Sequence, residues 1–185
     1  LEETVTDMVD TYVERLGVDR ICFNGGVALN CKLNKRIREL DSVDELFVQP
    51  VAHDGGLALG GGWSTVAPRE VEPMTHVYWG PAPEPDDVEA VLESSKLPFT
   101  RVDDVAAYTA ERIADGALVG WVYGRQEMGP RALGNRSILA DPRTEASRDR
   151  VNRHVKHREE WRPFAPSMLE ERADEYLVDF SPSPY

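Results

Sequence analysis

Residues 21–30 read Ile-Cys-Phe-Asn-Gly-Gly-Val-Ala-Leu-Asn, and they decide the expected fold of the first part of the chain. The apolar residues 21–23 predict a short buried strand, which Asn24 and the two glycines end. A helix is then predicted over about 27–40. A strand that leads through paired glycines into a helix lets backbone N–H groups approach an anion, so this stretch is a candidate phosphate or nucleotide site.

Helices and short apolar strands alternate along the rest of the chain, which predicts the α/β fold class. An apolar stripe at helical spacing predicts a helix over 1–16, with Gly17 as its C-cap. Five glycines between 55 and 63 predict a helix or loop that packs unusually close to a neighbour. The other predicted elements are a strand over 45–48, helices over 86–92, 103–114 and 146–157, and a buried strand over 117–123.

Five prolines lie between residues 67 and 85, in a stretch with little periodicity. Such a stretch is typical of a linker or of an extended crossing between domains. The expected organisation is therefore a first domain over 1–66, a linker over 67–85 and a second domain over 86–185.

Composition excludes several classes of protein. The 185 residues include 33 acidic and 21 basic side chains, which gives a formal net charge of −12, and 41% of the residues are hydrophobic, as in a folded chain. No apolar run approaches the ~20 residues that a membrane helix needs. Two cysteines are too few for a disulfide-stapled scaffold. The negative charge argues against general nucleic-acid binding, and the absence of a visible secretory signal predicts a cytoplasmic protein.

Two motifs in the first half are candidate ligand sites. In the first, Asn24 and Asn30 could hydrogen-bond a base, a ribose or the loop itself, and the alternative is a tight turn in which Asn24 caps the helix. In the second, Asp54 follows a predicted strand, where an acid can ligate a hard cation with room left by Gly55 and Gly56. The alternative is that Asp54 is an N-cap. Its neighbour His53 is expected to be a loop or supporting residue.

The second half contains a basic segment. Residues 125–162 carry nine arginines and one lysine against six acidic residues, a net charge of +4, whereas the rest of the chain carries −16. Arg131 and Arg136 lie in a glycine- and proline-rich frame that fixes backbone turns, so both are expected to bind an anion. Ser137 and exposed backbone N–H groups would complete this site. Surface ion pairs are expected instead for the remaining arginines at positions 143, 148, 150 and 153.

The same segment carries a family resemblance. Residues 124–143, with the core Gly-Pro-Arg-Ala-Leu-Gly-Asn-Arg-Ser-Ile-Leu-Ala-Asp-Pro-Arg, resemble the signature of O-carbamoyltransferases of the nodulation-protein and cephem-antibiotic type. Residues 151–168, with Arg-Pro-Phe-Ala-Pro-Ser at 162–167, resemble the next block of that family. The motifs at 24–30 and 54–56 are similar to the nucleotide site of its first domain. The resemblance covers almost the whole chain in the correct order.

The resemblance implies an enzyme that uses carbamoyl phosphate, with ATP and a divalent metal ion. A domain similar to threonylcarbamoyl-adenylate synthases would make carbamoyl-adenylate, and a domain with the actin/hexokinase-type ATPase fold would transfer the carbamoyl group to a hydroxyl of a small acceptor. Asp54 would ligate the metal. The implied nucleotide contacts are Asn24, Gly25, Gly26, Asn30 and Gly55. The implied catalytic residues are Arg131, Arg136 and Lys156, which together with Ser137, Arg158 and Arg162 would bind the phosphate groups of carbamoyl phosphate and ATP.

The chain also departs from the family pattern, because the paired metal histidines and the first phosphate loops have no counterpart in these residues. We therefore expect 1–66 to be the end of the transfer domain, 86–185 to be the start of the adenylating domain, and the isolated chain to be inactive. The expected partners are small-molecule substrates and the remainder of a longer chain, with a homodimer left open and with neither nucleic acid nor a membrane. Two alternatives stay open: a tRNA threonylcarbamoyl-transfer enzyme and a non-catalytic nucleotide- or anion-binding module.

Overall fold

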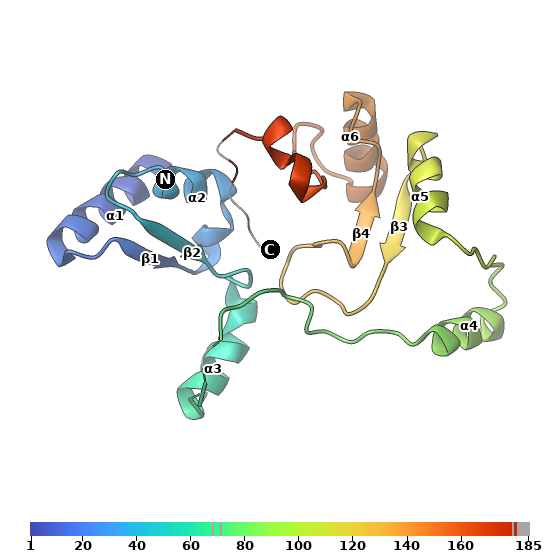
Figure 1. Ribbon diagram of the computed structural model, residues 1–185, viewed down its shortest axis with the longest axis horizontal. Helices are drawn as coiled ribbons and strands as arrows, with labels where there is room; N and C mark the ends of the chain where they lie inside the picture. The colour runs from blue at the N-terminus through green and yellow to red at the C-terminus, as the bar shows by residue number, and fades with distance from the viewer. Residues whose placement is uncertain (68, 71, 179, 181–185) are drawn as a thin grey trace. The chain divides into compact units, whose positions relative to one another are not determined.

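The computed structural model describes residues 1–67, 69–70, 72–178 and 180 (Figure 1). Its internal contacts divide the chain into two units. The first unit contains residues 1–77 together with 128–131, and the second contains 78–127 and the chain from 132 onward. Pro68 and Val71 of the predicted linker, and Asp179 and residues 181–185 of the second predicted domain, lie outside the described residues. The assignment of either predicted domain to a part of an enzyme stays a prediction.

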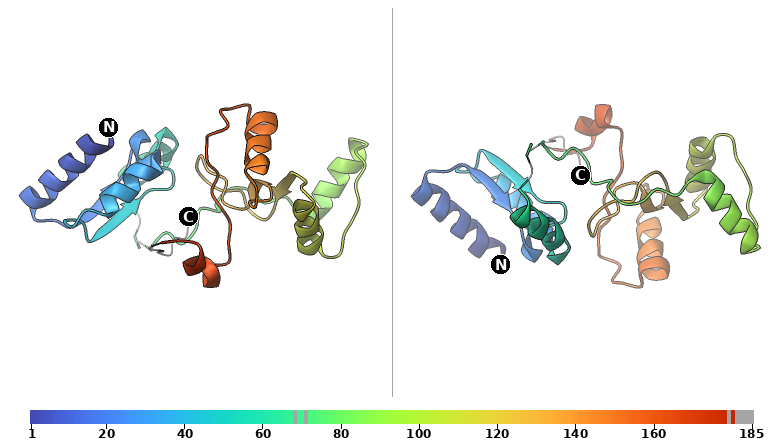
Figure 2. Two further views of the ribbon diagram at one scale, coloured as in Figure 1. Left: turned by 90° about the horizontal axis from the view of Figure 1, so that it is seen from above. Right: turned by 90° about the horizontal axis from the view of Figure 1, so that it is seen from below.

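In the first unit, a helix connects two parallel strands. The elements are α1 (Glu2–Leu16), β1 (Arg20–Phe23), α2 (Cys31–Arg38) and β2 (Glu45–Val48). β1 pairs with β2 in parallel, with Arg20 opposite Glu45, and α2 makes the crossover that parallel strands require. α1 packs beside α2, as Figure 2 shows. The predicted helix over 1–16 and both predicted strands are confirmed, and Gly17 ends α1 with φ 64° as expected of a C-cap. The burial predicted for residues 21–23 is wrong, because Cys22 is exposed and its neighbours in β1 are only partly buried.

The apolar core of the first unit lies between these elements. Its buried centre consists of Val13, Leu33, Ile37 and Val43, and neither Leu33 nor Ile37 has exposed surface. Partly buried side chains from α1, from both strands and from Leu40 surround this centre. Full burial of a leucine or isoleucine stabilises a fold by about 1.5–3 kcal/mol, so this centre holds α1 and α2 against the strands.

The predicted helix over 27–40 is divided in two. A 3₁₀ turn covers Gly26–Leu29, and α2 begins only at Cys31. Asn30 separates the two pieces, because its backbone is extended and its side-chain oxygen accepts the N–H groups of Lys32 and Leu33 at 3.1 and 3.2 Å. An asparagine that satisfies the first N–H groups of a helix in this way marks the position where the helix starts. After β2 a second 3₁₀ turn (Asp54–Gly56) leads into α3 (Leu57–Thr65).

The second unit is built on an antiparallel strand pair. β3 (Val119–Val122) pairs with β4 (Arg136–Leu139), and Val122 lies opposite Arg136. The helices are α4 (Pro85–Ser94), α5 (Val105–Ala114) and α6 (Glu145–Val151), of which α5 packs against β3. The predicted helices over 86–92 and 103–114 are confirmed. A strand is confirmed within 117–123, but its predicted burial is wrong, because β3 is only partly buried and Val122 is 65% exposed. β4 was not predicted, because its sequence Arg-Ser-Ile-Leu does not alternate between polar and apolar residues.

The last predicted helix, over 146–157, changes type part of the way along. α6 continues into a π-helical turn at Asn152–Lys156, and His157 ends it with φ 48° in the left-handed region. A 3₁₀ turn follows at Glu170–Glu175. The described residues therefore confirm a mixed α/β class with two small sheets, while the ATPase-like and synthase-like assignments stay predictions. Every helix in this described part is too short or too polar to cross a lipid bilayer.

Candidate functional site

The predicted nucleotide loop is open at its glycines. Gly25 has φ 93°, a conformation that other residues rarely adopt, and its N–H donates to the carbonyl of Ala52 at 2.9 Å. A Cβ added to Gly25 or Gly26 would meet no atom within 4 Å, so this side leaves room for a ligand. The alternative role of Asn24 as a helix cap is wrong. Its Oδ1 accepts the N–H of Gly25 at 2.9 Å, and the following 3₁₀ turn has no side-chain cap.

A short segment from later in the sequence packs within the first unit. The N–H of Met128 donates to the carbonyl of buried Val77 at 2.7 Å. Gly129 has φ 112° and lies so near Pro50 that an added Cβ would be 3.2 Å from the Pro50 carbonyl oxygen. Glycine is therefore required at this position by both its backbone conformation and its close packing.

This segment brings Arg131 to the nucleotide loop. Its Nη2 donates to the carbonyl of Leu29 at 3.4 Å, next to the helix cap Asn30. The side chain is exposed, and among the described residues it makes no ion pair. Arg136, which the sequence groups with Arg131, belongs to the second unit. The two arginines of this motif therefore contact different units.

The turn that holds the predicted metal ligand is tightly packed. His53 Nδ1 accepts the N–H of Gly55 at 2.9 Å and caps the 3₁₀ turn, so the alternative role of Asp54 as the N-cap is wrong. A Cβ added to Gly55 would be 2.6 Å from Cε1 of His53, and one added to Gly56 would be 2.3 Å from the carbonyl oxygen of Val51. The close packing predicted for 55–63 is confirmed for these two glycines, whereas the three glycines of α3 face open space.

Asp54 does not by itself form a metal centre. Its side chain is exposed, and the described residues contain no cluster of three or more His, Cys, Asp or Glu side chains. The buried Nε2 of His53 has no hydrogen-bond partner among them, but Gly55 fixes the ring of this residue through Nδ1. Divalent cations such as Ca²⁺ and Mg²⁺ take six or more oxygen ligands including water, so these residues do not fit a complete metal centre.

Glu127 organises the loop that leads into β4, and sequence reasoning missed it. The residue is 7% exposed, and its Oε1 accepts the N–H groups of Leu133 and Asn135 at 2.7 Å and of Arg136 at 3.2 Å. Burial alone would raise the pKa of this carboxyl, but the backbone N–H groups outweigh burial and hold the pKa below its ordinary value. The predicted nest of free backbone N–H groups is therefore wrong, because the protein's own carboxylate fills it.

Arg136 and Ser137 hold the same loop. Ser137 Oγ accepts the N–H of Gly134 at 3.1 Å. Arg136 donates from Nη1 and Nη2 to backbone carbonyls at 2.8–3.3 Å. The accepting residues are Pro81, Tyr123, Gly124 and Asn135. The guanidinium of Arg136 is thus engaged by the fold on several sides.

Several other arginines of the basic segment form ion pairs. Those confirmed as predicted are Arg143–Asp141 at 2.7 Å, Arg148–Asp149 at 2.8 Å, and Arg153–Glu160. Arg150 differs from the prediction, because the structure shows it donating to the carbonyl of Gly116. Arg162, predicted to bind phosphate, pairs with Glu159 at 2.8 Å.

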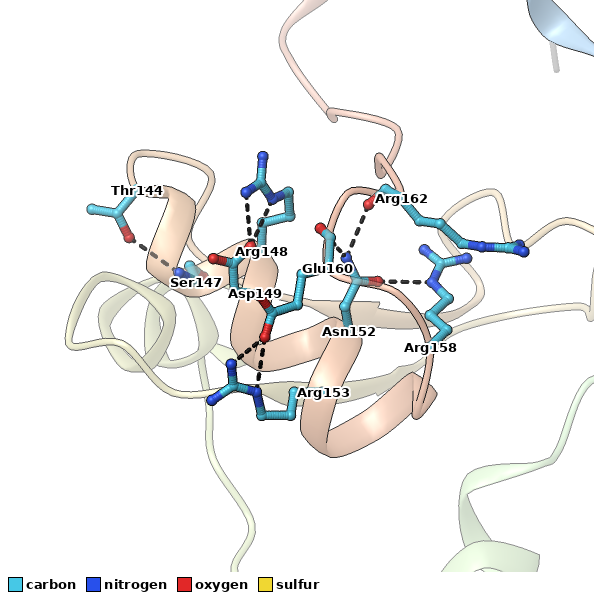
Figure 3. Close-up of polar contacts among 9 residues, drawn as sticks. All are labelled: Thr144, Ser147, Arg148, Asp149, Asn152, Arg153, Arg158, Glu160 and Arg162. Atoms are coloured by element: carbon cyan, nitrogen blue, oxygen red, sulfur yellow. Dashed lines mark hydrogen bonds and ion pairs between the residues drawn. The ribbon is translucent and has the colours of Figure 1, made fainter.

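The remaining predicted phosphate residues, Lys156 and Arg158, follow α6, and Figure 3 shows Arg158. Lys156 ends the π-helical turn and is exposed. Arg158 is half-buried, and its Nε donates to Oδ1 of Asn152 at 2.7 Å. Its guanidinium carbon lies 4.7 Å from the centre of the Phe164 ring, a cation–π contact. Asn152 was not predicted as a site residue. The available signal was its position, because a polar residue directly follows the apolar Val151 on a predicted helix.

Comparison with known proteins identifies the family. Residues 1–62 match the profile described as carbamoyltransferase N-terminus, and residues 110–185 match the profile described as carbamoyltransferase C-terminus. The chain is 47% identical to nodulation protein NolNO of Sinorhizobium fredii and 46% identical to nodulation protein NolO of Bradyrhizobium diazoefficiens, in each case over 96% of the chain. Nodulation protein U of Bradyrhizobium diazoefficiens is 34% identical over 91% of the chain.

The chain spans only 27%, 34% and 29% of the length of these three relatives, respectively. The two profiles nevertheless occur in the order that their names give, N-terminal before C-terminal. Together with the relatives, they show that this chain belongs to the carbamoyltransferase family.

Proposed function

We propose that the protein containing these residues is an ATP-dependent O-carbamoyltransferase. It would move the carbamoyl group of carbamoyl phosphate, through carbamoyl-adenylate, to a hydroxyl group of a small-molecule acceptor. The observation that carries this proposal is the presence of both parts of the family, in order, within one chain.

The proposed reaction balances with one water molecule. Carbamoyl phosphate loses inorganic phosphate to water, and an oxygen of the resulting carbamate attacks the α-phosphorus of ATP as pyrophosphate leaves. The acceptor hydroxyl then attacks the carbamoyl carbon, AMP leaves, and the hydroxyl proton passes to solvent. Both stages depend on positioning and on stabilisation of negative charge more than on covalent chemistry by the protein.

In the second unit, Lys156 and Arg158 are the side chains best placed to contact phosphate directly. Lys156 offers an exposed ammonium, and Arg158 offers a planar fork whose orientation is fixed before a ligand arrives. Arg136 and Ser137 would act through the loop that they hold. Arg162 would add positive charge next to its partner Glu159.

In the first unit, the loop at 24–30 and Arg131 are the proposed nucleotide contacts. The open side of Gly25 and Gly26 supports this role, and the guanidinium at the Leu29 carbonyl adds a cation that a phosphate group could meet. Asp54 is proposed as one metal ligand only, since the part of the chain that the structure describes holds no cluster of side chains that would complete a centre.

Charge supports a small acceptor over tRNA. The chain carries −12, and the negative field of such a surface repels a nucleic-acid backbone. In the full-length protein, we expect added tRNA to leave the rate of AMP release unchanged. A rate that rises with tRNA concentration would instead support the threonylcarbamoyl-transfer alternative.

Isothermal titration calorimetry on the full-length protein tests the two proposed binding sites. Carbamoyl phosphate and ATP are titrated into the wild type, Arg131→Ala and Arg158→Ala. We expect Arg158→Ala to weaken carbamoyl phosphate binding by about tenfold, since a charge-assisted hydrogen bond contributes roughly 1.5–3 kcal/mol. Arg131→Ala should weaken ATP binding and leave carbamoyl phosphate binding unchanged.

Arg148→Ala is the matched control for net charge. It removes one guanidinium from the same basic segment, but its partner is Asp149 and it has no proposed ligand. If this control and Arg158→Ala lose the same amount of affinity for carbamoyl phosphate, the loss comes from the change in overall charge and not from a specific contact. A wild-type chain that bound neither ligand would contradict the proposed function.

A further inference from the structure

Asn152 is a polar side chain buried in the second unit. None of its surface is exposed, and it stands at the start of the π-helical turn that follows α6. Burial of an amide without hydrogen-bond partners is costly, so each of its polar atoms needs a partner inside the protein.

Figure 3 shows these partners. Nδ2 donates to the carbonyls of Glu160 and Arg162 at 3.1 and 2.9 Å, and Oδ1 accepts Nε–H of Arg158 at 2.7 Å. The orientation of the amide follows from chemistry, because two carbonyls accept only and Nε–H donates only. In addition, the backbone carbonyl of Asn152 accepts the N–H of Arg158 at 3.1 Å. Asn152 therefore joins both ends of the loop at 158–162 to α6.

These contacts restrict the guanidinium of Arg158 in two ways. The bond to Asn152 fixes the Nε edge, and the ring of Phe164 covers one face. Nη2 has only a long contact, 3.4 Å to the carbonyl of Pro163, and Nη1 has no partner among the described residues. Two carboxylates lie in the same loop, but Glu159 pairs with Arg162 and Glu160 pairs with Arg153. The terminal Nη1 and Nη2 edge is left for a ligand.

We propose that Asn152 is a positioning residue for Arg158. It holds the guanidinium so that Nη1 and Nη2 face the phosphoryl group of carbamoyl phosphate, an arrangement that gives bidentate binding to phosphate oxygens. A side chain that is already held loses less conformational entropy when the ligand binds. This inference rests on the proposed function, in which Arg158 contacts carbamoyl phosphate.

A double-mutant cycle tests this role. Carbamoyl phosphate and, separately, inorganic phosphate are titrated calorimetrically into the wild type, Asn152→Ala, Arg158→Ala and the double variant. We expect Asn152→Ala to raise the Kd about tenfold in the wild-type background and to have no further effect once Arg158 is replaced, which is the behaviour of coupled residues. An equal rise in both backgrounds would overturn the proposal.

Thr144→Ala is the control for a general loss of stability. Thr144 accepts the N–H of Ser147 at 3.3 Å as the N-cap of α6, so its removal weakens the helix that carries Asn152 without touching Arg158. The Kd of Thr144→Ala for carbamoyl phosphate should stay within about twofold of the wild-type value. A loss as large as that of Asn152→Ala would mean that helix stability, and not positioning, sets the affinity.

A spectroscopic readout and a second variant complete the test. The Nε–H proton of Arg158 should exchange slowly with water in the wild type and rapidly in Asn152→Ala. Should that variant unfold by circular dichroism, Asn152→Leu replaces it, because leucine fills the buried space that alanine would leave and still removes the acceptor for Nε–H of Arg158. The double-mutant cycle with Arg158→Ala is then repeated with this second variant, and the same outcomes support or overturn the proposal.

The outcomes separate this inference from the function on which it rests. If the wild type binds neither phosphate compound, the proposed function fails and the inference fails with it. If the wild type binds, Arg158→Ala weakens binding, and both replacements of Asn152 leave binding unchanged, the inference alone is wrong.

Discussion

The two units of the chain are stabilised by different kinds of contact. In the first, apolar side chains at helical spacing meet in a buried centre around Leu33 and Ile37. In the second, Glu127 and Asn152 are buried polar side chains that each bind several backbone groups of a loop. An apolar core tolerates small shifts of its members, whereas such a polar network holds its loop in one conformation. The unit with the polar network also carries the proposed phosphate residues other than Arg131.

The largest effect is expected in the apolar centre. Leu33→Ala should lower the free energy of unfolding of the first unit by about 3–5 kcal/mol, because it removes a fully buried side chain and leaves a cavity. Urea unfolding, followed by circular dichroism, measures the change. A loss below about 1 kcal/mol would mean that this centre does not hold the unit together.

A smaller effect that depends on pH is expected in the polar network. Glu127→Gln keeps the shape of the side chain but removes the charge that three backbone N–H groups bind, which should cost about 1–2 kcal/mol near neutral pH. The pKa of Glu127 is lower in the folded state than its unfolded value of about 4.3, so the charge stabilises the fold above that value.

This stabilisation should disappear as the pH falls through the lower folded pKa. Urea unfolding at a series of pH values measures the free energy of unfolding of wild type and of Glu127→Gln. The difference between the two should be largest near neutral pH and should become smaller below about pH 4. A difference that stayed constant, or widened in acid, would contradict the assigned role of the carboxylate.

Next in size is the helix cap of the first unit. Asn30→Ala should cost about 1 kcal/mol, because the N–H groups of Lys32 and Leu33 lose their acceptor. Asn24→Ala is the matched control, since its oxygen bonds only to the N–H of the next residue. Thermal unfolding measures the loss of stability in each variant. Equal losses in the two variants would argue against a capping role for Asn30.

The smallest effect is expected at the surface ion pairs. Arg148→Ala removes a partly exposed partner of Asp149, and ion pairs that solvent reaches contribute little because solvent screens them. The urea midpoint should stay at the wild-type value. A clear fall would show that the second unit depends on its surface charges as well as on its buried polar groups.

The same contrast explains what the sequence could predict. The apolar stripe of residues 1–16 and the apolar runs at 21–23 and 45–48 produce the elements expected of them, because burial follows periodicity. The break at Asn30 was harder to predict. Asparagine caps helices and also occurs inside loops, so its role depends on which N–H groups lie nearby.

The polar network was beyond prediction from sequence. Nothing in the pattern shows that the carboxylate of Glu127 turns toward the N–H groups of Leu133 and Asn135, because this depends on the path of the intervening turn. The family motif marked Arg131 and Arg136 together, but their contacts lie in different units. A motif records which residues are present, whereas the path of the chain decides what each one contacts.

The proposed carbamoyltransferase activity is tested most directly by measuring release of pyrophosphate from ATP, with and without carbamoyl phosphate, in the full-length protein. This assay needs no knowledge of the acceptor. We expect pyrophosphate to form only when ATP and carbamoyl phosphate are both present, and Arg158→Ala to slow its formation by about tenfold or more, in line with loss of a charge-assisted contact. Pyrophosphate release without carbamoyl phosphate, or an unchanged rate in Arg158→Ala, would contradict the proposed activity.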